Sequence, residues 1–375
     1  MQSPDEYSPE RISAALALRT LRLFENKAAA PRVQSAATAP VLMPPNEVGS
    51  HSARVASISE TRFDLFDPIH RRFEQQAARY PQEIAVVCGI ENIAYGELNS
   101  RANHLARYLR RVTASPATLV GIFMEPCIGT VICLLAALKA GIPYIPLDPN
   151  TAAAQTAAIL SETEALVLLP SESTPACLPA RRARAISVES ERESIECGNG
   201  SNFPRSAVVE APGNAAVYTF SADQKGRPLS HGACIDSIDS LRVALCLTPT
   251  DKFVATMQPD LALCGLWILG PLVYGARLIL APAHGQISDF PFDEIEQSRA
   301  VILQATASIA IALLHDRRRL GGKLKFVCGA DTWPGELLTR LEEVGVEVWQ
   351  LQGSAASYQV SRSSVHRSGL SVVVG

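Results

Sequence analysis

Three residue types that together can activate a nucleophile follow one another closely in this chain. Ser230, His231 and Asp236 supply a hydroxyl, an imidazole and a carboxylate, the groups of a serine hydrolase triad. In enzymes with a nucleophile elbow the serine lies at a sharp turn of the type Gly-x-Ser-x-Gly, and its partners follow much later in the sequence. Neither feature is present here, so we do not expect hydrolytic chemistry from these residues.

Thiol and imidazole groups, the usual ligands of zinc, are scattered along the chain. The nine cysteines include no Cys-x-x-Cys pair and their number is odd, which favours neither a zinc site nor a disulfide framework. His70, His104 and His315 fall on expected helix surfaces with no second ligand at metal-binding spacing. We therefore predict no metal site, reduced thiols and a cytoplasmic location.

The composition excludes two classes of partner. The 375 residues are 47% hydrophobic and 19% charged, with a net charge of −3, whereas nucleic-acid-binding proteins normally carry a basic face. The same balance argues against a polybasic membrane-surface protein. No apolar run is long enough to cross a bilayer, and the polar start MQSPDEYSPE is unlike a secretory signal. We expect no nucleic-acid partner and no membrane partner.

The elements that position any site begin after a leader of different character, residues 1–60. Apolar residues from Ile12 to Leu23 recur at near-helical spacing behind Ser8 and Pro9, which predicts one amphipathic helix. An Ala-, Pro- and Ser-rich stretch without periodicity follows and has the composition of a flexible linker. The helix either docks onto a partner or packs on its own domain, and the sequence favours neither.

From residue 61 onward, strand-like and helix-like patterns alternate. Apolar runs such as IAVVCG and ATLVGIFM are each followed by amphipathic or buried helical patterns, which predicts βαβ units around mainly parallel sheets. The polar, Gly- and Ser-rich stretch 190–213 is expected to be a surface connection. It separates two α/β halves, about 61–190 and 211–375.

Two blocks of the first half resemble the adenylation domains of nonribosomal peptide synthetases, which belong to the adenylate-forming superfamily. IAYGELNSRANHLARYL at 93–109 and LKAGIPYIPLDP at 138–149 are similar to that family's first two core motifs. The block between them has the strand followed by a helix that is usual in the family at this point, and the resemblance covers residues 63–375. It implies the large N-terminal subdomain of an adenylate-forming enzyme, an α/β fold of two halves. Both motifs are scaffold, so they indicate fold more than chemistry.

The resemblance implies a loop that cradles the phosphates of ATP, written YTSGSTGKPKG in the family. The corresponding stretch here is YTFSADQKGRPLSH, residues 218–231, in which the flanks survive and the small residues of the loop do not. Phe220 and Gln224 add bulk where backbone must approach phosphate, and Asp223 adds a negative charge. Four residues form the remnant of the loop and still have groups that could contact phosphate: Thr219, Ser221, Lys225 and Arg227.

The family's next motif supplies an aspartate that commonly holds the α-amino group of the substrate. Asp260 stands at that position, and Leu261, Cys264 and Gly265 follow where the family lines its substrate pocket. The resemblance thus implies a small or apolar lining. Asp260 serves equally well as the N-cap of the helix that follows it.

Two later motifs have lost residues that the family uses. Gly329-Ala330-Asp331 stands where Gly-Gly-Glu is usual, and only Gly353 remains of the motif Asn-x-Tyr-Gly-Pro-Thr-Glu. Gln352 replaces its aromatic residue. Ala356 replaces the carboxylate that contacts magnesium, and an alanine side chain offers no oxygen ligand to that ion.

The sequence also stops short of several parts that the resemblance implies. The family continues with a ribose-binding aspartate, a hinge and a C-terminal subdomain with the catalytic lysine, on whose movement thioester formation relies. We therefore read the chain as truncated before that subdomain. A fragment of a longer synthetase would show the same ending, but that would not explain Ala356 or the altered phosphate loop.

Together these features predict a degenerate adenylation-like domain without independent adenylation activity and without catalytic or metal-binding residues of its own. It would be a structural or interaction element in nonribosomal peptide biosynthesis, with a synthetase or carrier-protein partner. One alternative is ATP- and Mg-dependent activation of a small or apolar amino acid, with a partner completing the site. Another is a non-catalytic binding module for an amino-acid ligand. No cofactor is expected unless the enzyme alternative holds.

Overall fold

A computed structural model describes residues 67–113, 119–125, 127–149, 153–163, 166–169, 185–204, 214–220, 226–256, 261–281, 301–304, 306–315, 324–328, 333–354 and 357–363. The chain divides into two units, Met1–Ala56 and Ser57–Gly375, and every described residue belongs to the second. The helix predicted within the leader, residues 1–60, lies outside the described residues.

One of the two sheets has six strands in the order β6-β5-β3-β4-β7-β8. Neighbouring strands are parallel, except that β7 and β8 form an antiparallel hairpin. Helix α5 (Ile128–Ala140) lies between β3 and β4 in the sequence, and α6 (Ala153–Thr163) between β4 and β5, as in βαβ units. The strand bounds are β3 (Val120–Phe123), β4 (Tyr144–Leu147), β5 (Leu166–Leu169), β6 (Ala185–Ser187), β7 (Ala215–Phe220) and β8 (Gly226–Ser230).

The other sheet has eight strands in the order β14-β13-β12-β11-β9-β10-β1-β2. Its six central strands are parallel, and an antiparallel strand closes each edge. The bounds are β1 (Ile84–Cys88), β2 (Glu91–Ala94), β9 (Lys252–Thr256), β10 (Arg277–Ala281), β11 (Val301–Gln304), β12 (Leu324–Cys328), β13 (Glu347–Ser354) and β14 (Ser357–Ser363). The prediction of an α/β fold with mainly parallel sheets is confirmed.

Each sheet includes a hairpin from the half of the sequence that supplies most of the other sheet. The β1–β2 hairpin precedes every strand of the six-stranded sheet, yet β1 pairs with β10 of the eight-stranded sheet. In return, the β7–β8 hairpin joins the six-stranded sheet through β4. The two sheets are therefore interlocked through the chain path, and no single cut in the sequence separates them.

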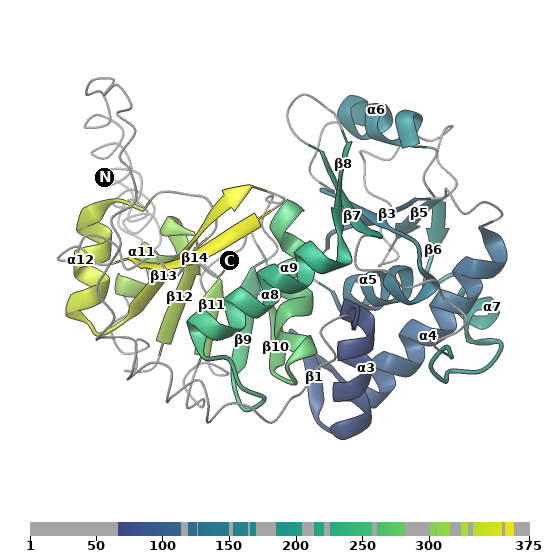
Figure 1. Ribbon diagram of the computed structural model, residues 1–375, viewed down its shortest axis with the longest axis horizontal. Helices are drawn as coiled ribbons and strands as arrows, with labels where there is room; N and C mark the ends of the chain where they lie inside the picture. Colours follow the sequence, from purple (N-terminus) through teal and green to yellow (C-terminus); the bar gives the residue numbers. More distant parts are fainter. Residues whose placement is uncertain are drawn as a thin grey trace, which may run out of the picture. The chain divides into compact units, whose positions relative to one another are not determined.

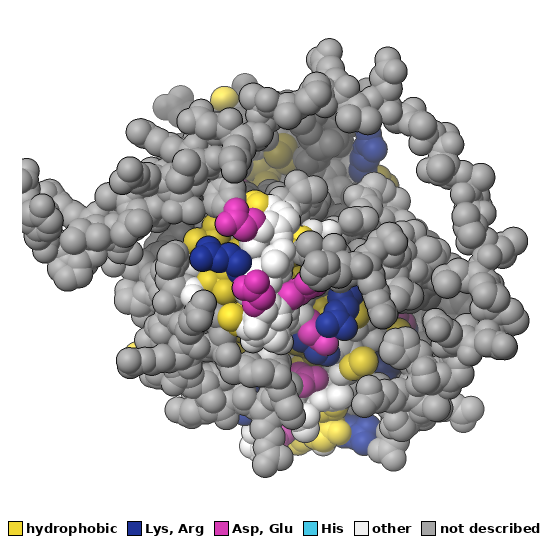
Figure 2. Space-filling model, turned by 90° about the vertical axis from the view of Figure 1, so that its left-hand side faces the viewer, with side chains coloured by type: hydrophobic (Ala, Val, Ile, Leu, Met, Phe, Trp, Pro, Cys, Tyr) yellow, Lys and Arg dark blue, Asp and Glu magenta, His cyan; other side chains and the backbone are white. Residues whose placement is uncertain are grey.

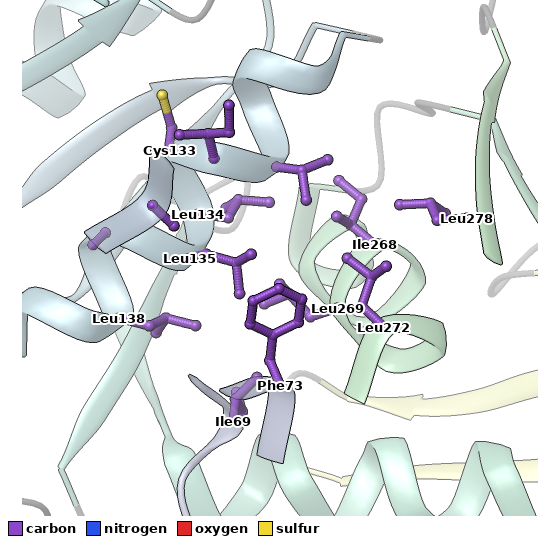
Figure 3. Close-up of a cluster of buried hydrophobic side chains, with 14 of the residues drawn as sticks. Ile69, Phe73, Cys133, Leu134, Leu135, Leu138, Ile268, Leu269, Leu272 and Leu278 are labelled. Atoms are coloured by element: carbon purple, nitrogen blue, oxygen red, sulfur yellow. The ribbon is translucent and has the colours of Figure 1, made fainter. Parts of the chain in front are cut away.

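Helices fill the space between these sheets and form the main core (Figure 1). Leucines of α5 face Ile268, Leu269 and Leu272 of α9 (Leu261–Val273), and Phe73 of α3 (Ile69–Arg79) closes the cluster (Figure 3). Helix α5 is apolar and buried along almost its whole length because it packs on several sides. It ends at Gly141, whose positive φ of 76° suits the expected glycine turn.

Helix α4 (Tyr95–Val112) binds the described part of the predicted connection 190–213. The Asn103 amide donates hydrogen bonds to the carbonyl of Gly200 at 2.8 Å and to Oδ1 of Asn202 at 2.9 Å. Arg107 and Arg110 lie over the Phe203 ring, at 4.5 and 5.1 Å from its centroid. The described part of the predicted connection, up to residue 204, is thus held on the helix surface.

Two further helices cover the outer part of the eight-stranded sheet, and the exposed face of the second carries mixed charge. They are α11 (Ala307–His315) and α12 (Gly335–Glu343), which pack against a second apolar cluster around Phe326. Acidic and basic side chains are interleaved on the described part of the face in Figure 2. No described helix is both long enough and apolar enough to cross a membrane.

Candidate functional site

The remnant of the phosphate loop lies at the tip of the β7–β8 hairpin. Phe220 pairs with Gly226 and Thr219 with Arg227, so residues 221–225 connect the two strands. The Thr219 hydroxyl is buried and donates to the Arg227 carbonyl at 3.4 Å, while Arg227 itself is exposed. Ser221 and Lys225 lie outside the described residues. The hairpin therefore keeps its paired strands and presents at least one cation beside its turn.

Ser230 has a structural role at the start of α8 (His231–Leu245), the helix that follows this hairpin. The Ser230 hydroxyl accepts a hydrogen bond from the Ala233 amide at 3.2 Å and caps the helix. His231 is buried and packs edge-on against His70, with ring centroids 6.0 Å apart, whereas Asp236 is exposed. These placements agree with the exclusion of a catalytic triad.

The expected amino-acid pocket begins at the first turn of α9. Leu261 starts that helix and Cys264 lies one turn into it, while Asp260 lies just outside the described residues. A Cβ atom on Gly265 would lie within 3.0 Å of the Tyr144 hydroxyl oxygen. Because Tyr144 belongs to β4, this turn of α9 lies directly against the six-stranded sheet. Helix α9 also packs against β7, the strand that carries Thr219.

A buried polar pair that the sequence analysis did not single out lies at the carboxyl ends of two neighbouring parallel strands. The Thr256 amide and hydroxyl donate to Oε1 of Gln304 at 2.7 and 2.9 Å. Thr256 ends β9 and Gln304 ends β11, and both are nearly inaccessible to solvent. In open α/β sheets, ligands bind beyond this strand end. The signal in the sequence was a glutamine closing the apolar run VILQ.

The stretch that replaces the family's magnesium motif forms another hairpin. Residues from Gln350 to Ser354 belong to β13, and Ser354 pairs with Ser357 of β14. Ala356 lies outside the described residues, in the connection between these strands. Gln352 and Gly353 of this stretch therefore lie in β13.

Among the described residues, several cysteine thiols have raised pKa values and the possible metal ligands are scattered. No group of three or more His, Cys, Asp and Glu side chains is arranged there to hold a metal ion. Burial raises the pKa of Cys88 to about 11 and that of Cys234 to about 12, so both thiols stay protonated at neutral pH. Protonated, buried thiols are poor nucleophiles.

Sequence comparison places these features in a family. Residues 73–357 match the family described as AMP-binding enzyme. The chain belongs to the AMP-binding enzyme family. The match spans both sheets, from α3 to the beginning of β14, so the resemblance drawn from the two core motifs is confirmed.

The relatives of this AMP-binding chain include several nonribosomal peptide synthetases. It is 33% identical over 222 residues to tyrocidine synthase 3 of Brevibacillus parabrevis, covering 58% of this chain. It is 32% identical over 242 residues to chondramide synthase cmdD of Chondromyces crocatus, covering 62% of this chain. The chain spans only 3% and 6% of the lengths of these two relatives.

Solved structures support the fold. A crystal structure of the nonribosomal peptide synthetase FmoA3 bound to AMPPNP superimposes with a TM-score of 0.71 at 21% identity, covering 85% of this chain and 35% of that one. The N-terminal subdomain of Klebsiella oxytoca NpsA, in complex with 3-hydroxybenzoyl-AMSN, gives a TM-score of 0.67 at 17% identity, covering 81% and 79%. The described residues of this AMP-binding chain thus have the fold of the N-terminal subdomain of adenylation domains.

Proposed function

We propose that this AMP-binding chain does not form acyl-adenylates on its own and serves as a structural or interaction element in nonribosomal peptide biosynthesis. The observation that carries the proposal is the β7–β8 hairpin, in which paired strands frame a turn of altered composition. Residues 221–225 read Ser-Ala-Asp-Gln-Lys. Backbone amides wrap phosphate closely only where side chains are small, and the Asp223 carboxylate would repel a polyphosphate.

The β13–β14 hairpin supports the same proposal independently. Its connection contains Ala356 at the position where the family has a carboxylate. Mg²⁺ requires oxygen ligands, so the ion that accompanies ATP would lose one protein contact. Two substitutions in separate motifs act against the same substrate.

A synthetase or a carrier protein is the partner that fits this proposal. The relatives are large synthetases, and one similar solved structure is an artificially fused adenylation–PCP di-domain from Klebsiella oxytoca. An intact adenylation-type scaffold would offer such a partner the same kind of surface as an active adenylation domain, even without turnover.

Calorimetric titration with Mg·ATP, alone and together with a pool of amino acids, tests the proposal. We expect no binding heat in either titration. Saturable heat that disappears in the Lys225→Ala/Arg227→Ala double variant would overturn it. That result would instead favour ATP-dependent activation of a small or apolar amino acid, with Asp260 binding the ammonium group.

A second candidate function, non-catalytic binding of an amino acid, is favoured by the Thr256–Gln304 pair. This buried polar pair lies at the carboxyl ends of two strands. Asp260 follows one of its members, Thr256, closely in the sequence. A carboxylate at position 260 would pair with the ammonium group of a ligand.

Thermal unfolding with individual amino acids tests this second candidate. A ligand should raise the unfolding temperature of the wild type, and the Asp260→Ala variant should lose that rise. An equal rise in both proteins would exclude Asp260 from the site, and no rise with any amino acid would exclude the function.

A further inference from the structure

Helix α9 is held at its C-terminal end by two buried tyrosines. The Tyr95 hydroxyl lies 2.8 Å from the carbonyl oxygen of Ala276 and 3.3 Å from that of Leu272, both of which accept its hydrogen bond. The Tyr274 hydroxyl bonds to the Asp239 carboxylate, which also accepts from Arg72 at 2.6 Å. These directional bonds fix the end of α9 relative to α3, α4 and α8.

The body of α9 is held by apolar contact. Its residues Ile268, Leu269 and Leu272 face the leucines of α5 in the core (Figure 3). Apolar contacts are non-directional, so they define the position of the helix along its axis less sharply than the hydrogen bonds at its end do. Pro271 lies inside the helix and has no N–H to donate to the carbonyl of Trp267. The helix therefore lacks one of its own hydrogen bonds between the fixed end and the first turns.

At the first turns of α9, Tyr144 of the six-stranded sheet occupies the space that a side chain at position 265 would fill. A Cβ on Gly265 would lie within 3.0 Å of the Tyr144 hydroxyl oxygen, nearer than real Cβ contacts, whereas the ring carbon Cζ would lie at 3.5 Å, an ordinary contact distance. The hydroxyl oxygen alone makes the fit tight. Tyr144 is 4% exposed, so its ring has little room to move aside.

We propose that Tyr144 is a positioning residue, whose hydroxyl, inserted against Gly265, sets the place of the first turn of α9 relative to the six-stranded sheet. The same turn carries Leu261 and Cys264. If an amino acid binds as in the second candidate function, Tyr144 defines one wall of its pocket from the opposite sheet. Only that last consequence rests on the proposed binding.

Thiol labelling followed by mass spectrometry of individual cysteines tests the proposal without any ligand. The reporter is Cys264, next to Gly265. Exposed Cys246 is the internal reference for reagent and pH, and fully buried Cys133 reports global opening. The proteins compared are the wild type, Gly265→Ala, Tyr144→Phe and the double variant.

We expect Gly265→Ala to displace the first turn and to change the labelling rate of Cys264 by about tenfold relative to the wild type, because the thiol is carried by that turn. Cys133 should stay protected. Removing the hydroxyl in the double variant should return Cys264 to within about twofold of the wild type, because the nearest ring atom then lies at contact distance.

The matched control is Gly270→Ala in the same helix. A Cβ there would meet only Leu241 at 3.7 Å and Ile238 at 3.9 Å, so it should leave Cys264 labelling unchanged. Unaltered labelling in Gly265→Ala, or a double variant that labels as fast as Gly265→Ala, would overturn the proposal. Equal acceleration at Cys133 would show general destabilisation and would overturn it too. If Gly265→Ala does not fold, recovery of a folded protein in the double variant supports the proposal, and continued failure contradicts it.

Discussion

At the scale of single residues, the most unusual group is a lysine without contact to solvent. The Lys139 side chain has 0% exposure and is paired with Glu74, itself only 7% exposed. Its ammonium also donates to Oδ1 of Asn99 at 2.8 Å, and Arg71 shares the Glu74 carboxylate at 2.9 Å. Arg71 donates further to the Phe203 carbonyl at 2.8 Å. This network joins α3, α4 and α5 to the connection held on α4.

Burial lowers the pKa of Lys139 to about 8 from its usual 10.5, although Glu74 partly opposes the shift. Between pH 8 and 10.5 the unfolded state therefore holds a proton that the folded state has released. Unfolding free energy rises with pH wherever the unfolded state binds more protons. We expect the stability of the wild type relative to Lys139→Met to increase across this window, measured by urea unfolding at several pH values.

The control for that comparison is Arg101→Met on the exposed face of α4. Arg101 pairs with Glu97 at 2.6 Å, but its side chain is 42% exposed, and such surface pairs contribute little. Its pH profile should run parallel to that of the wild type. A constant difference between wild type and Lys139→Met from pH 8 to 10.5 would show that the lysine does not titrate there.

The candidate site residues show what a single sequence can and cannot locate. Thr219 and Arg227 were identified because they stand in a motif with intact flanks, and the structure places them opposite each other in one hairpin. Thr256 and Gln304 are 48 residues apart, and no local pattern relates them. They meet because β9 and β11 are neighbours in the sheet, which is a property of strand order.

At the scale of elements, two of the altered motifs are hairpins, and each keeps its paired strands while the residues that connect the strands have changed. Strand pairing depends on backbone hydrogen bonds and tolerates varied side chains. Phosphate binding depends on the small size of the turn residues. A change in the residues between the strands therefore requires no change of fold, which explains how a recognisable scaffold accompanies an unrecognisable loop.

Restoring the turn tests this separation. Replacing residues 220–224 with Ser-Gly-Ser-Thr-Gly should create saturable Mg·ATP binding in calorimetry, because backbone amides become accessible to phosphate. The same replacement combined with Lys225→Ala should weaken that binding by removing a cation. If the restored hairpin folds and still gives no heat, the loop composition is not what prevents ATP binding.

Elements with a strong periodic or apolar pattern were predicted correctly, and short polar strands were not. The apolar run IAVVCG contains β1, and ATLVGIFM contains β3. Strands β2, β8 and β14 were missed because Glu91–Ala94, Gly226–Ser230 and Ser357–Ser363 have no apolar run. Each of these strands is the antiparallel partner at a sheet edge, and it exists because its hairpin neighbour supplies the hydrogen bonds.

At the scale of the whole molecule, two sheets share a helical core and exchange hairpins. The family follows from motifs that are local in sequence, and so it was recognised early. The exchange of hairpins was not predictable, because β1 and β10 are far apart in the sequence: Val86 pairs with Leu278. Strand pairing and the shared helical core hold this interlocked scaffold together.

Amino-acid-dependent exchange of labelled pyrophosphate into ATP tests the central claim most directly, because the exchange requires reversible adenylate formation. The assay uses the chain as it is, with Mg·ATP and each amino acid in turn. We predict no exchange above the level measured without an amino acid. Exchange with any amino acid that is abolished in the Asp260→Ala variant would contradict the claim and establish a working adenylating enzyme.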